Sequence, residues 1–320
     1  MGKLVSIIIP TYKGCDKLPR AIDSALSQTY ENIEIIVVDD NDPGSAGRQE
    51  TEEIMRGYCE DHKCISYIKR EQNGGIASAK NTGILAAKGY YISFLDDDDY
   101  YLDERVKRCV EYLEEHNSYV GVYTGVDVYD SYGYKILRLR PDKNLTIREL
   151  LMNVMAMGTG SNTFIRREYA EMVGMHDESF VRRTDIEFTI RLCKCGEIGY
   201  ITDCQVVKTT RANLNVPSYE KYKEVLNKFF NKFEADIETL GDDKDEFYRR
   251  QYNGILSIAM KERDNDEIRE SYNLVKKYGG VSLGKRIVIW LHLHNLRDTV
   301  VVNALVSFAR RLRNIKNVFC

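Results

Sequence analysis

Three features are missing from this sequence, and each absence removes a class of protein. No stretch of about 20 residues is apolar enough to suggest a membrane span. Polar residues interrupt the apolar C-terminal stretch, namely Asn295, Arg297, Asp298 and Asn303. The 46 basic and 49 acidic residues nearly cancel, so no overall field would attract nucleic acid, and neither an internal repeat nor a low-complexity segment is present. We therefore expect a protein without membrane spans or repeats that binds no nucleic acid.

The eight cysteines lack the spacing of a structural zinc site. They occur at irregular positions, and neither Cys193 with Cys195 nor Cys59 with Cys64 belongs to a two-pair pattern. No signal peptide precedes Val5. Reduced thiols packed in the core of a cytoplasmic protein are therefore the expectation.

Two common phosphate-binding loops are also absent. A dinucleotide-binding loop contains Gly-x-Gly-x-x-Gly, and the loop of many NTPases ends in Gly-Lys-Ser or Gly-Lys-Thr. The first loop of this chain, at 10–14, reads Pro-Thr-Tyr-Lys-Gly and fits neither pattern. If the protein binds phosphates, carboxylates that carry Mg²⁺ or Mn²⁺ are the simplest remaining device.

Apolar strands alternate with helical patterns through the first hundred residues. The strands are expected at 5–9, 33–38, 65–68 and 90–95, and the helices between them at 18–26, 48–58 and 76–87. This alternation predicts an α/β fold with a mostly parallel central sheet, because parallel neighbours need a crossover connection. In such sheets ligands bind beyond the carboxyl ends of the strands, where 10–12, Asp39-Asp40 and Asp96–Asp99 all fall.

Four consecutive aspartates, Asp96–Asp99, follow the apolar strand expected at 90–95. Like charges at the end of a buried strand repel one another and lose hydration, so a divalent cation or a metal–diphosphate complex would stabilise them. An acidic loop fully bathed in water is the alternative. The two neighbouring polar clusters favour the cation site.

Five motifs of the first half occur together in one order and spacing. They are 6–12 (Ser-Ile-Ile-Ile-Pro-Thr-Tyr), 27–30 (Ser-Gln-Thr-Tyr), 34–40 (Glu-Ile-Ile-Val-Val-Asp-Asp), 73–81 (Asn73, Gly75 and Ala79-Lys80-Asn81) and 94–99 (Phe-Leu-Asp-Asp-Asp-Asp). In these motifs the chain closely resembles family 2 glycosyltransferases of the GT-A fold. The resemblance extends over roughly the first 215 residues, through 161–167, 173–180 and 183–188. It implies a nucleotide-sugar-binding sheet and a transfer that inverts the anomeric centre.

The resemblance implies a nucleotide pocket at the first two strand ends. There Asp40 accepts a hydrogen bond from uracil, and Pro10, Thr11, Tyr12 and Asp39 line the same pocket. The alternative for the two aspartates is a turn or a helix cap after the strand.

The acidic run aligns with the Asp-x-Asp motif of the family. The resemblance makes Asp98 the ligand of Mn²⁺ or Mg²⁺, with Asp96 and Asp97 facing the ribose and the surroundings of the metal. Asp99 is either a capping or a solvated residue. Lys80 stands where relatives commonly carry arginine and could reach a phosphate, although a plain surface lysine is the alternative.

The resemblance also supplies a catalytic base. Relatives read Glu-Asp before the last helix; here Thr184 replaces the glutamate and Asp185 keeps the base position. One carboxylate suffices to take the proton of an acceptor hydroxyl. The alternative for Asp185 is an N-cap of a helix at 186–195. Many relatives have a histidine after this helix. The equivalent stretch of this chain, 208–211, contains no histidine, so Arg211 or Lys208 could bind the phosphates instead.

We expect two regions, a GT-A catalytic domain at 1–216 and a helical C-terminal extension at 217–320. The catalytic domain is expected to have a nucleotide-sugar-binding half (1–100) and an acceptor half (101–216). The segment 281–320 has seven Lys or Arg residues against one acid and a lone Trp290, which suits a basic amphipathic tail on the inner membrane surface. Packing on the catalytic domain or on a second subunit is the alternative.

The resemblance implies a metal-dependent, inverting hexosyltransferase. The expected donor is a UDP-sugar, and the expected acceptor is a polyprenyl-diphosphate-linked glycan for capsule or O-antigen. Transfer of one sugar is favoured, because the Gln-x-x-Arg-Trp motif and the spanning helices of processive synthases are absent. A sugar nucleotidyltransferase and a catalytically silent scaffold are the alternatives.

Overall fold

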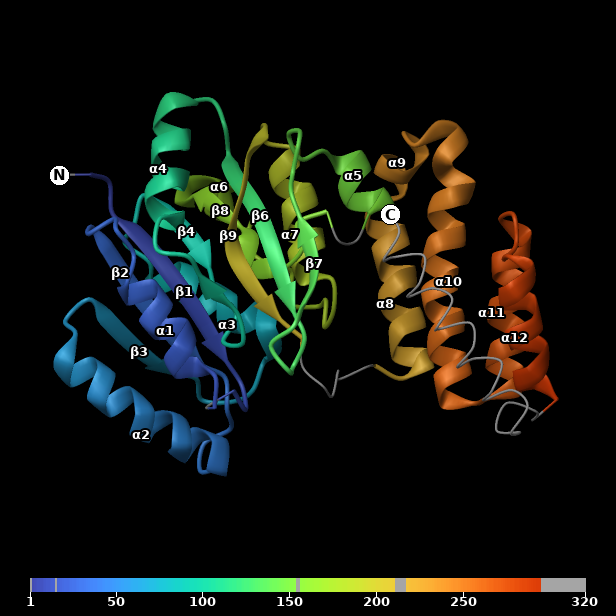
Figure 1. Cartoon of the computed structure of the whole chain (residues 1–320), viewed down its shortest axis with the longest axis horizontal. Coiled ribbons are helices and arrows are strands. Elements are labelled where there is room, and N and C mark those ends of the chain that lie inside the picture. The colour runs from blue at the N-terminus through green and yellow to red at the C-terminus, as the bar shows by residue number, and fades with distance from the viewer. Residues whose placement is uncertain (1, 15, 154–155, 211–216, 295–320) are drawn as a thin grey trace. The chain divides into compact units, whose positions relative to one another are not determined.

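The computed structural model describes residues 2–14, 16–153, 156–210 and 217–294 of the chain (Figure 1). Contacts divide the chain into two units, Met1–Leu214 and Asn215–Cys320. The first unit contains the strands, whereas residues 217–294 of the second contain helices and no strand.

In the part of the chain that the structure describes, the first unit is built on a nine-stranded sheet. The strand order is β3-β2-β1-β4-β8-β6-β9-β5, and β7 pairs with β6. The strands are β1 Val5–Thr11, β2 Ile33–Asp39, β3 Ile65–Lys69, β4 Tyr91–Phe94, β5 Tyr100–Tyr101, β6 Gly121–Tyr129, β7 Lys135–Leu139, β8 Phe164–Arg166 and β9 Ile198–Thr209.

The strands β3, β2, β1 and β4 run parallel, as the alternation of strands and helices predicts. Strand β1 continues through Pro10, and Thr11 pairs in register with Asp39, so the first two polar clusters lie side by side at one edge. The other strands are mixed: β8 is antiparallel to both its neighbours, whereas β6 and β9 are parallel. The fold is α/β, but no sequence pattern indicated these antiparallel strands.

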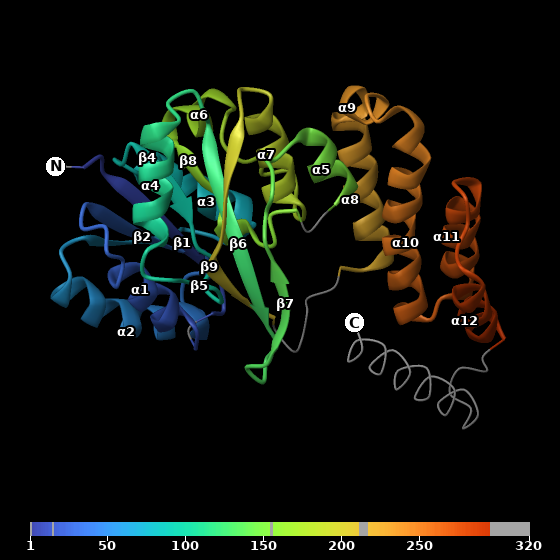
Figure 2. The same ribbon diagram turned by 45° about the horizontal axis from the view of Figure 1, so that its top comes forward.

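Helices cover both faces of the sheet. They are α1 Leu18–Leu26, α2 Ala46–Asp61, α3 Gly75–Ala86, α4 Arg105–Glu115, α5 Ile147–Met152, α6 Arg167–Met172 and α7 Thr184–Cys193. Helices α1, α2 and α4 lie on one face, and α3, α6 and α7 lie on the other (Figure 1, Figure 2). The apolar runs of β1, β2 and β4 are buried, as expected for parallel strands covered on both faces.

A buried histidine belongs to the core between β4 and α7. The ring of His176 stacks on Phe188 at 4.1 Å and meets Phe94 edge-on at 5.3 Å. Burial, reinforced by the nearby Lys80 ammonium, holds the pKa of His176 well below its ordinary value of 6.5. The folded protein therefore keeps this ring neutral.

The neutral ring makes stability depend on pH. Below pH 6.5 the unfolded chain binds a proton at His176 that the folded chain does not bind, so the contribution of His176 to stability falls as the pH falls. The expected slope is about 1.4 kcal/mol per pH unit. His176→Phe keeps the aromatic packing and should remove this slope. Urea unfolding of both proteins at pH 7.0, 6.0 and 5.0 measures the effect, and parallel curves for the two proteins would contradict it.

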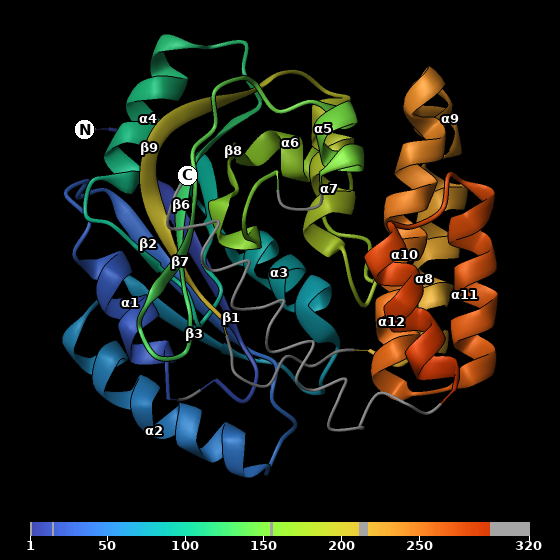
Figure 3. The same cartoon turned by 45° about the vertical axis from the view of Figure 1, so that its right-hand side comes forward.

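The second unit is a group of helices packed on a common apolar core (Figure 3). They are α8 Tyr219–Lys232, α9 Glu234–Glu238, α10 Lys244–Glu262, α11 Asn265–Lys277 and α12 Leu283–Leu293. Helices α8 and α9 are separated at Phe233, whose ring is buried against Phe229. No helix within the described ranges is long and apolar enough to cross a membrane. The predicted tail beyond 294 lies outside the described residues.

Candidate active site

The acidic run after β4 alternates between outward and inward side chains. Asp97 and Asp99 are buried, whereas Asp96 and Asp98 are partly exposed. The inward carboxylate of Asp97 accepts a hydrogen bond from Thr11 Oγ1 at 2.8 Å, which ties the run to the end of β1. The sequence predicted one acidic cluster; the structure divides it into a buried pair and a partly exposed pair.

Asp99 is neither solvated nor a helix cap. Its carboxylate accepts hydrogen bonds from Ser161 Oγ at 2.6 Å, Thr159 Oγ1 at 2.7 Å and the backbone N–H of Thr209 at 3.2 Å. Burial, reinforced by the charges of Asp96 and Asp98, raises the pKa of Asp99 to about 7. This residue joins the acidic run to the 159–161 segment and to the end of β9.

Ser161 is the central hydroxyl of that network, because its oxygen also accepts the backbone N–H of Asp96 at 3.0 Å. Ser161→Ala leaves the buried Asp99 carboxylate short of one donor and the Asp96 N–H short of its acceptor. We expect a loss of about 1–3 kcal/mol of unfolding free energy. Urea unfolding measures it, with the exposed Ser118→Ala as control. Equal stability of the two variants would show that the network contributes nothing.

A pocket of about 190 Å³ opens beside the outward pair. Asp96 lines it from the acidic run, Asp185 from the first turn of α7, and Lys208 from β9. The 156–160 segment and apolar side chains of α5 and α7 complete the wall. Donor-side and acceptor-side residues predicted from distant motifs thus face the same cavity.

Lys80 is part of this site and is not a surface lysine. Its side chain is 3% exposed, its Nζ lies 3.3 Å from Asp96 Oδ1, and it approaches the ring of Phe94 at 5.3 Å. A buried ammonium needs a partner of opposite charge, and Asp96 supplies it. The sequence prediction that Lys80 belongs to the site is consistent with this placement, and its surface alternative is wrong.

Asp185 does not cap α7. The helix starts at Thr184, Arg183 occupies the N-cap position, and Asp185 lies within the first turn and lines the pocket. The N-cap alternative is therefore wrong.

Asp39 is saturated by partners within the chain. One oxygen accepts from the backbone N–H and the side-chain amide of Asn41, both at 2.8 Å. The other accepts from Tyr67 Oη and lies 3.0 Å from Arg48 Nε. A carboxylate has about four lone-pair positions; Asp39 uses three of them for hydrogen bonds, and the Arg48 guanidinium forms an ion pair with it as well.

Asp40 is occupied in the same way. Its oxygens accept from Arg70 Nη1, from Asn73 Nδ2 at 3.1 Å, and from the backbone N–H groups of Gly74 and Gly75 at 3.0 and 2.8 Å. The structure thus gives Asp40 a role in holding the loop before α3. Recognition of uracil by Asp40 stays a prediction, and it requires sharing or replacing one of these donors.

The other residues predicted for the nucleotide pocket lie at the same strand end. Thr11 is buried, and Pro10 is enclosed within β1. Tyr12, directly after the strand, is 42% exposed, so its ring is available to a planar ligand. Arg211 lies outside the described residues.

The side chains grouped near Asp98 show how the predicted metal ion could be held. Within the described residues, no three His, Cys, Asp or Glu side chains are grouped to hold a metal ion by themselves. Mg²⁺ and similar ions are often held by one or two carboxylates together with substrate phosphates. The partly exposed Asp98 fits that use, and the neighbouring Asp96 Oδ1 is buried without a hydrogen bond although Lys80 pairs with it.

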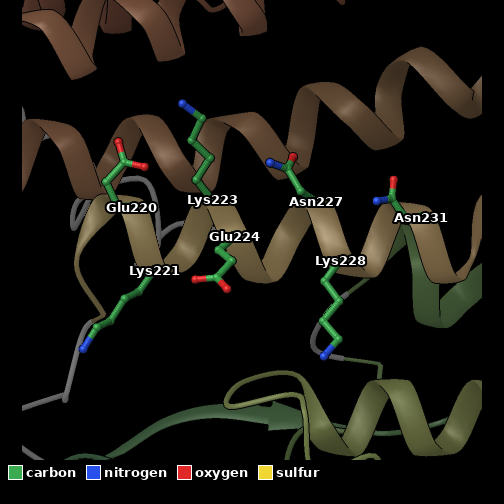
Figure 4. A pocket seen from close by; sticks show the side chains of 7 residues that line it. All are labelled: Glu220, Lys221, Lys223, Glu224, Asn227, Lys228 and Asn231. Carbon is green, nitrogen blue, oxygen red and sulfur yellow. The ribbon is translucent and has the colours of Figure 1, made fainter.

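A larger groove, of about 620 Å³, lies along α8. Its lining consists of lysines, glutamates and asparagines that project from the one helix in different directions (Figure 4). Both lysines and glutamates line it, so the groove has no strongly dominant charge. The chemistry predicted from the sequence lies in the smaller pocket.

Sequence comparison finds a family model and several glycosyltransferases that match the chain. Residues 6–174 match the family model described as Glycosyl transferase family 2. An uncharacterized glycosyltransferase of Rickettsia prowazekii is 32% identical over 240 residues, covering 72% of this chain and 72% of the relative. One from Rickettsia felis is 31% identical over 235 residues, covering 72% of this chain and 38% of the relative. The chain thus spans well under half of the Rickettsia felis protein.

Solved structures show the same fold. TarS 1–349 of S. aureus, crystallised in complex with UDP-GlcNAc, superposes with a TM-score of 0.58 at 17% sequence identity, covering 87% of this chain and 91% of that chain. The same fragment in complex with UDP gives a TM-score of 0.56. Together with the family match over more than half of its length, this similarity shows that the chain belongs to glycosyl transferase family 2 and has the GT-A fold.

Proposed function

We propose that the protein transfers one sugar from a UDP-sugar to a hydroxyl group of a glycan, with inversion at the anomeric carbon. One observation carries this proposal: Asp96 of the acidic run and Asp185 of α7 line the same small pocket. An in-line displacement needs a base on one side of the reacting carbon and the diphosphate on the other. The donor class is further supported by the UDP-GlcNAc and UDP named for the TarS structures.

In this proposal Asp185 takes the proton of the acceptor hydroxyl as its oxygen attacks the anomeric carbon. The new carbon–oxygen bond forms while the bond to the diphosphate breaks, and UDP leaves with the electron pair. A divalent ion, Mn²⁺ or Mg²⁺, when bound at Asp98, neutralises charge on the leaving diphosphate. Lys80, which pairs with Asp96, and Lys208 of the pocket wall add positive charge to the site.

Release of UDP tests the activity. The protein is incubated with UDP-hexoses and UDP-N-acetylhexosamines and with polyprenyl-diphosphate-linked sugars, with Mn²⁺, with Mg²⁺ or with EDTA. We expect acceptor-dependent UDP release that EDTA abolishes, and a product of inverted anomeric configuration by NMR. Product that retains the donor configuration would exclude the mechanism. The family assignment favours this activity over nucleotidyl transfer.

We also propose that the enzyme is cytoplasmic and meets its acceptor at the inner membrane surface, in capsule or O-antigen synthesis. The supporting feature is α12, which exposes Leu283, Ile287 and Trp290 by 73%, 53% and 52%. Their spacing puts them on one face of the helix, and no acidic residue lies between Leu283 and His294. Apolar side chains with neighbouring basic charge are typical of helices that lie on anionic membranes.

Flotation with anionic liposomes tests the membrane proposal. Ile287→Ser with Trp290→Ser removes exposed apolar area without opening the core, and we expect it to lower liposome binding by about tenfold. Deletion after Val281 should lower binding further while leaving UDP affinity unchanged. Liposome binding equal to wild type in both variants would remove the proposal.

A further inference from the structure

One glycine of the pocket lies close to Lys80 and to two charged side chains of the pocket wall, Asp96 and Asp185. A Cβ atom built on Gly160 would lie 3.0 Å from Lys80 Nζ, 3.6 Å from Asp185 Cβ and 3.6 Å from Asp96 Oδ2. These side chains come from α3, from α7 and from the acidic run after β4. The space over Gly160 is therefore the space between the expected base and the donor-side carboxylate.

The backbone of Gly160 does not require glycine. Its φ lies outside the left-handed region, whereas that of Gly158, two residues earlier, is +78°. An alanine at 160 would meet no backbone strain, so the effect of its methyl group would be one of space alone.

The main chain at Gly160 is held in place and cannot move away from an added side chain. Ser161 and Asn162 are fully buried. The side-chain amide of Asn162 donates to the carbonyl groups of Thr124 at 2.7 Å and Met157 at 2.8 Å and accepts from the Thr124 N–H at 2.9 Å. Any group added at 160 must therefore project into the pocket or displace the tip of Lys80.

The pocket is small enough for such a group to matter. Its volume of about 190 Å³ lies below the roughly 300–1,000 Å³ of pockets that take drug-sized ligands, so it suits one monosaccharide unit and not a whole nucleotide sugar. A methyl group is about the size of a water molecule, whose share of liquid volume is about 30 Å³.

We propose that Gly160 is a specificity-determining residue, whose missing side chain leaves the room that the transferred sugar needs between Asp96 and Asp185. The inference rests on the proposed function. It assigns the limit on sugar size to a backbone position, whereas Lys80 adds positive charge for the diphosphate and Asp185 takes the proton of the acceptor. UDP itself does not need this space; the sugar does.

Gly160→Ala tests the inference through the difference between UDP and UDP-sugar. For the UDP-sugar that the wild-type enzyme turns over, we expect kcat/KM to fall about 10–100-fold, since overfilling a packed site is strongly unfavourable. In an Asp185→Asn background, which prevents turnover, calorimetry should show weaker binding of that UDP-sugar and binding of UDP within twofold of the background. Gly160→Ser should give the larger loss.

Two controls separate this effect from a structural one. Gly57→Ala, on the exposed part of α2 where a Cβ meets nothing within 4 Å, should match wild type in all assays. Lys80→Met tests whether the methyl acts by displacing the lysine: the effect of Gly160→Ala should persist in that variant.

Three outcomes would each overturn the inference: unchanged kcat/KM in Gly160→Ala, equal weakening of UDP and UDP-sugar binding, or loss of the effect with Lys80→Met. Failure of the wild-type enzyme to turn over any UDP-sugar would instead overturn the proposed function, and the inference with it.

Discussion

Asp185→Asn is expected to lower kcat for sugar transfer by about 10²–10⁴-fold, the usual contribution of a general base. Asparagine has nearly the same size, so the first turn of α7 and the pocket wall should stay in place. The amide cannot take the proton of the attacking hydroxyl at neutral pH. The measurement is initial-rate UDP release, together with calorimetric titration of UDP in the presence of Mn²⁺.

UDP affinity separates this result from misfolding. We expect the dissociation constant for UDP to stay within about threefold of wild type, because the proposed mechanism places Asp185 at the reacting sugar and not at the nucleotide. Asp203→Asn, an exposed carboxylate on β9 that pairs with Arg108, serves as the matched control. Full activity of Asp185→Asn would show that another group is the base.

Asp98→Ala is expected to remove stimulation by Mn²⁺ or Mg²⁺ and to lower kcat/KM by about 10²–10³-fold, which corresponds to about 3–4 kcal/mol of transition-state stabilisation. Asp98 belongs to the partly exposed pair, and the carboxylates of Asp97 and Asp99 already hold the run in place. The variant should therefore fold normally.

Titration of the metal ion makes this prediction specific. Wild-type activity should rise with Mn²⁺ and disappear in EDTA, whereas Asp98→Ala should respond to neither. Asp103→Ala, an exposed aspartate shortly after the run, is the control. A metal dependence of Asp98→Ala equal to that of wild type would place the ion elsewhere.

The first half of the fold could be predicted from the sequence because its signals are local. The helix Leu18–Leu26 agrees with its predicted bounds, and the strands β1 to β4 lie within two residues of theirs. Each buried parallel strand is a continuous apolar run, and each helix repeats its apolar residues at helical spacing. Short strands of mixed direction, such as β8 and β5, have no such signal, because their direction is set by pairing with distant strands.

The hydrogen-bond partners that hold the site residues in place could not be predicted from the sequence, because they lie far away along the chain. Asp99 depends on Ser161, 62 positions away, and Asp97 depends on Thr11, 86 positions away. A run of four aspartates gives no sign of which members turn inward. Burial of Lys80 is equally a result of tertiary packing, since α3 places it over β4. Local sequence patterns identify which residues have suitable chemistry. Tertiary packing decides which of these side chains are buried in hydrogen bonds and which are exposed to a ligand.

The alternation of the four aspartates makes the length of that segment matter as much as its composition. Inserting one residue between Leu95 and Asp96 would shift each carboxylate to the opposite side. The side chains that now bond to Thr11 and Ser161 would then point outward, and the partly exposed ones would enter the interior. The loop would keep most of its negative charge and still lose its geometry, so insertions or deletions there should be tolerated far less well than exchanges of aspartate for asparagine.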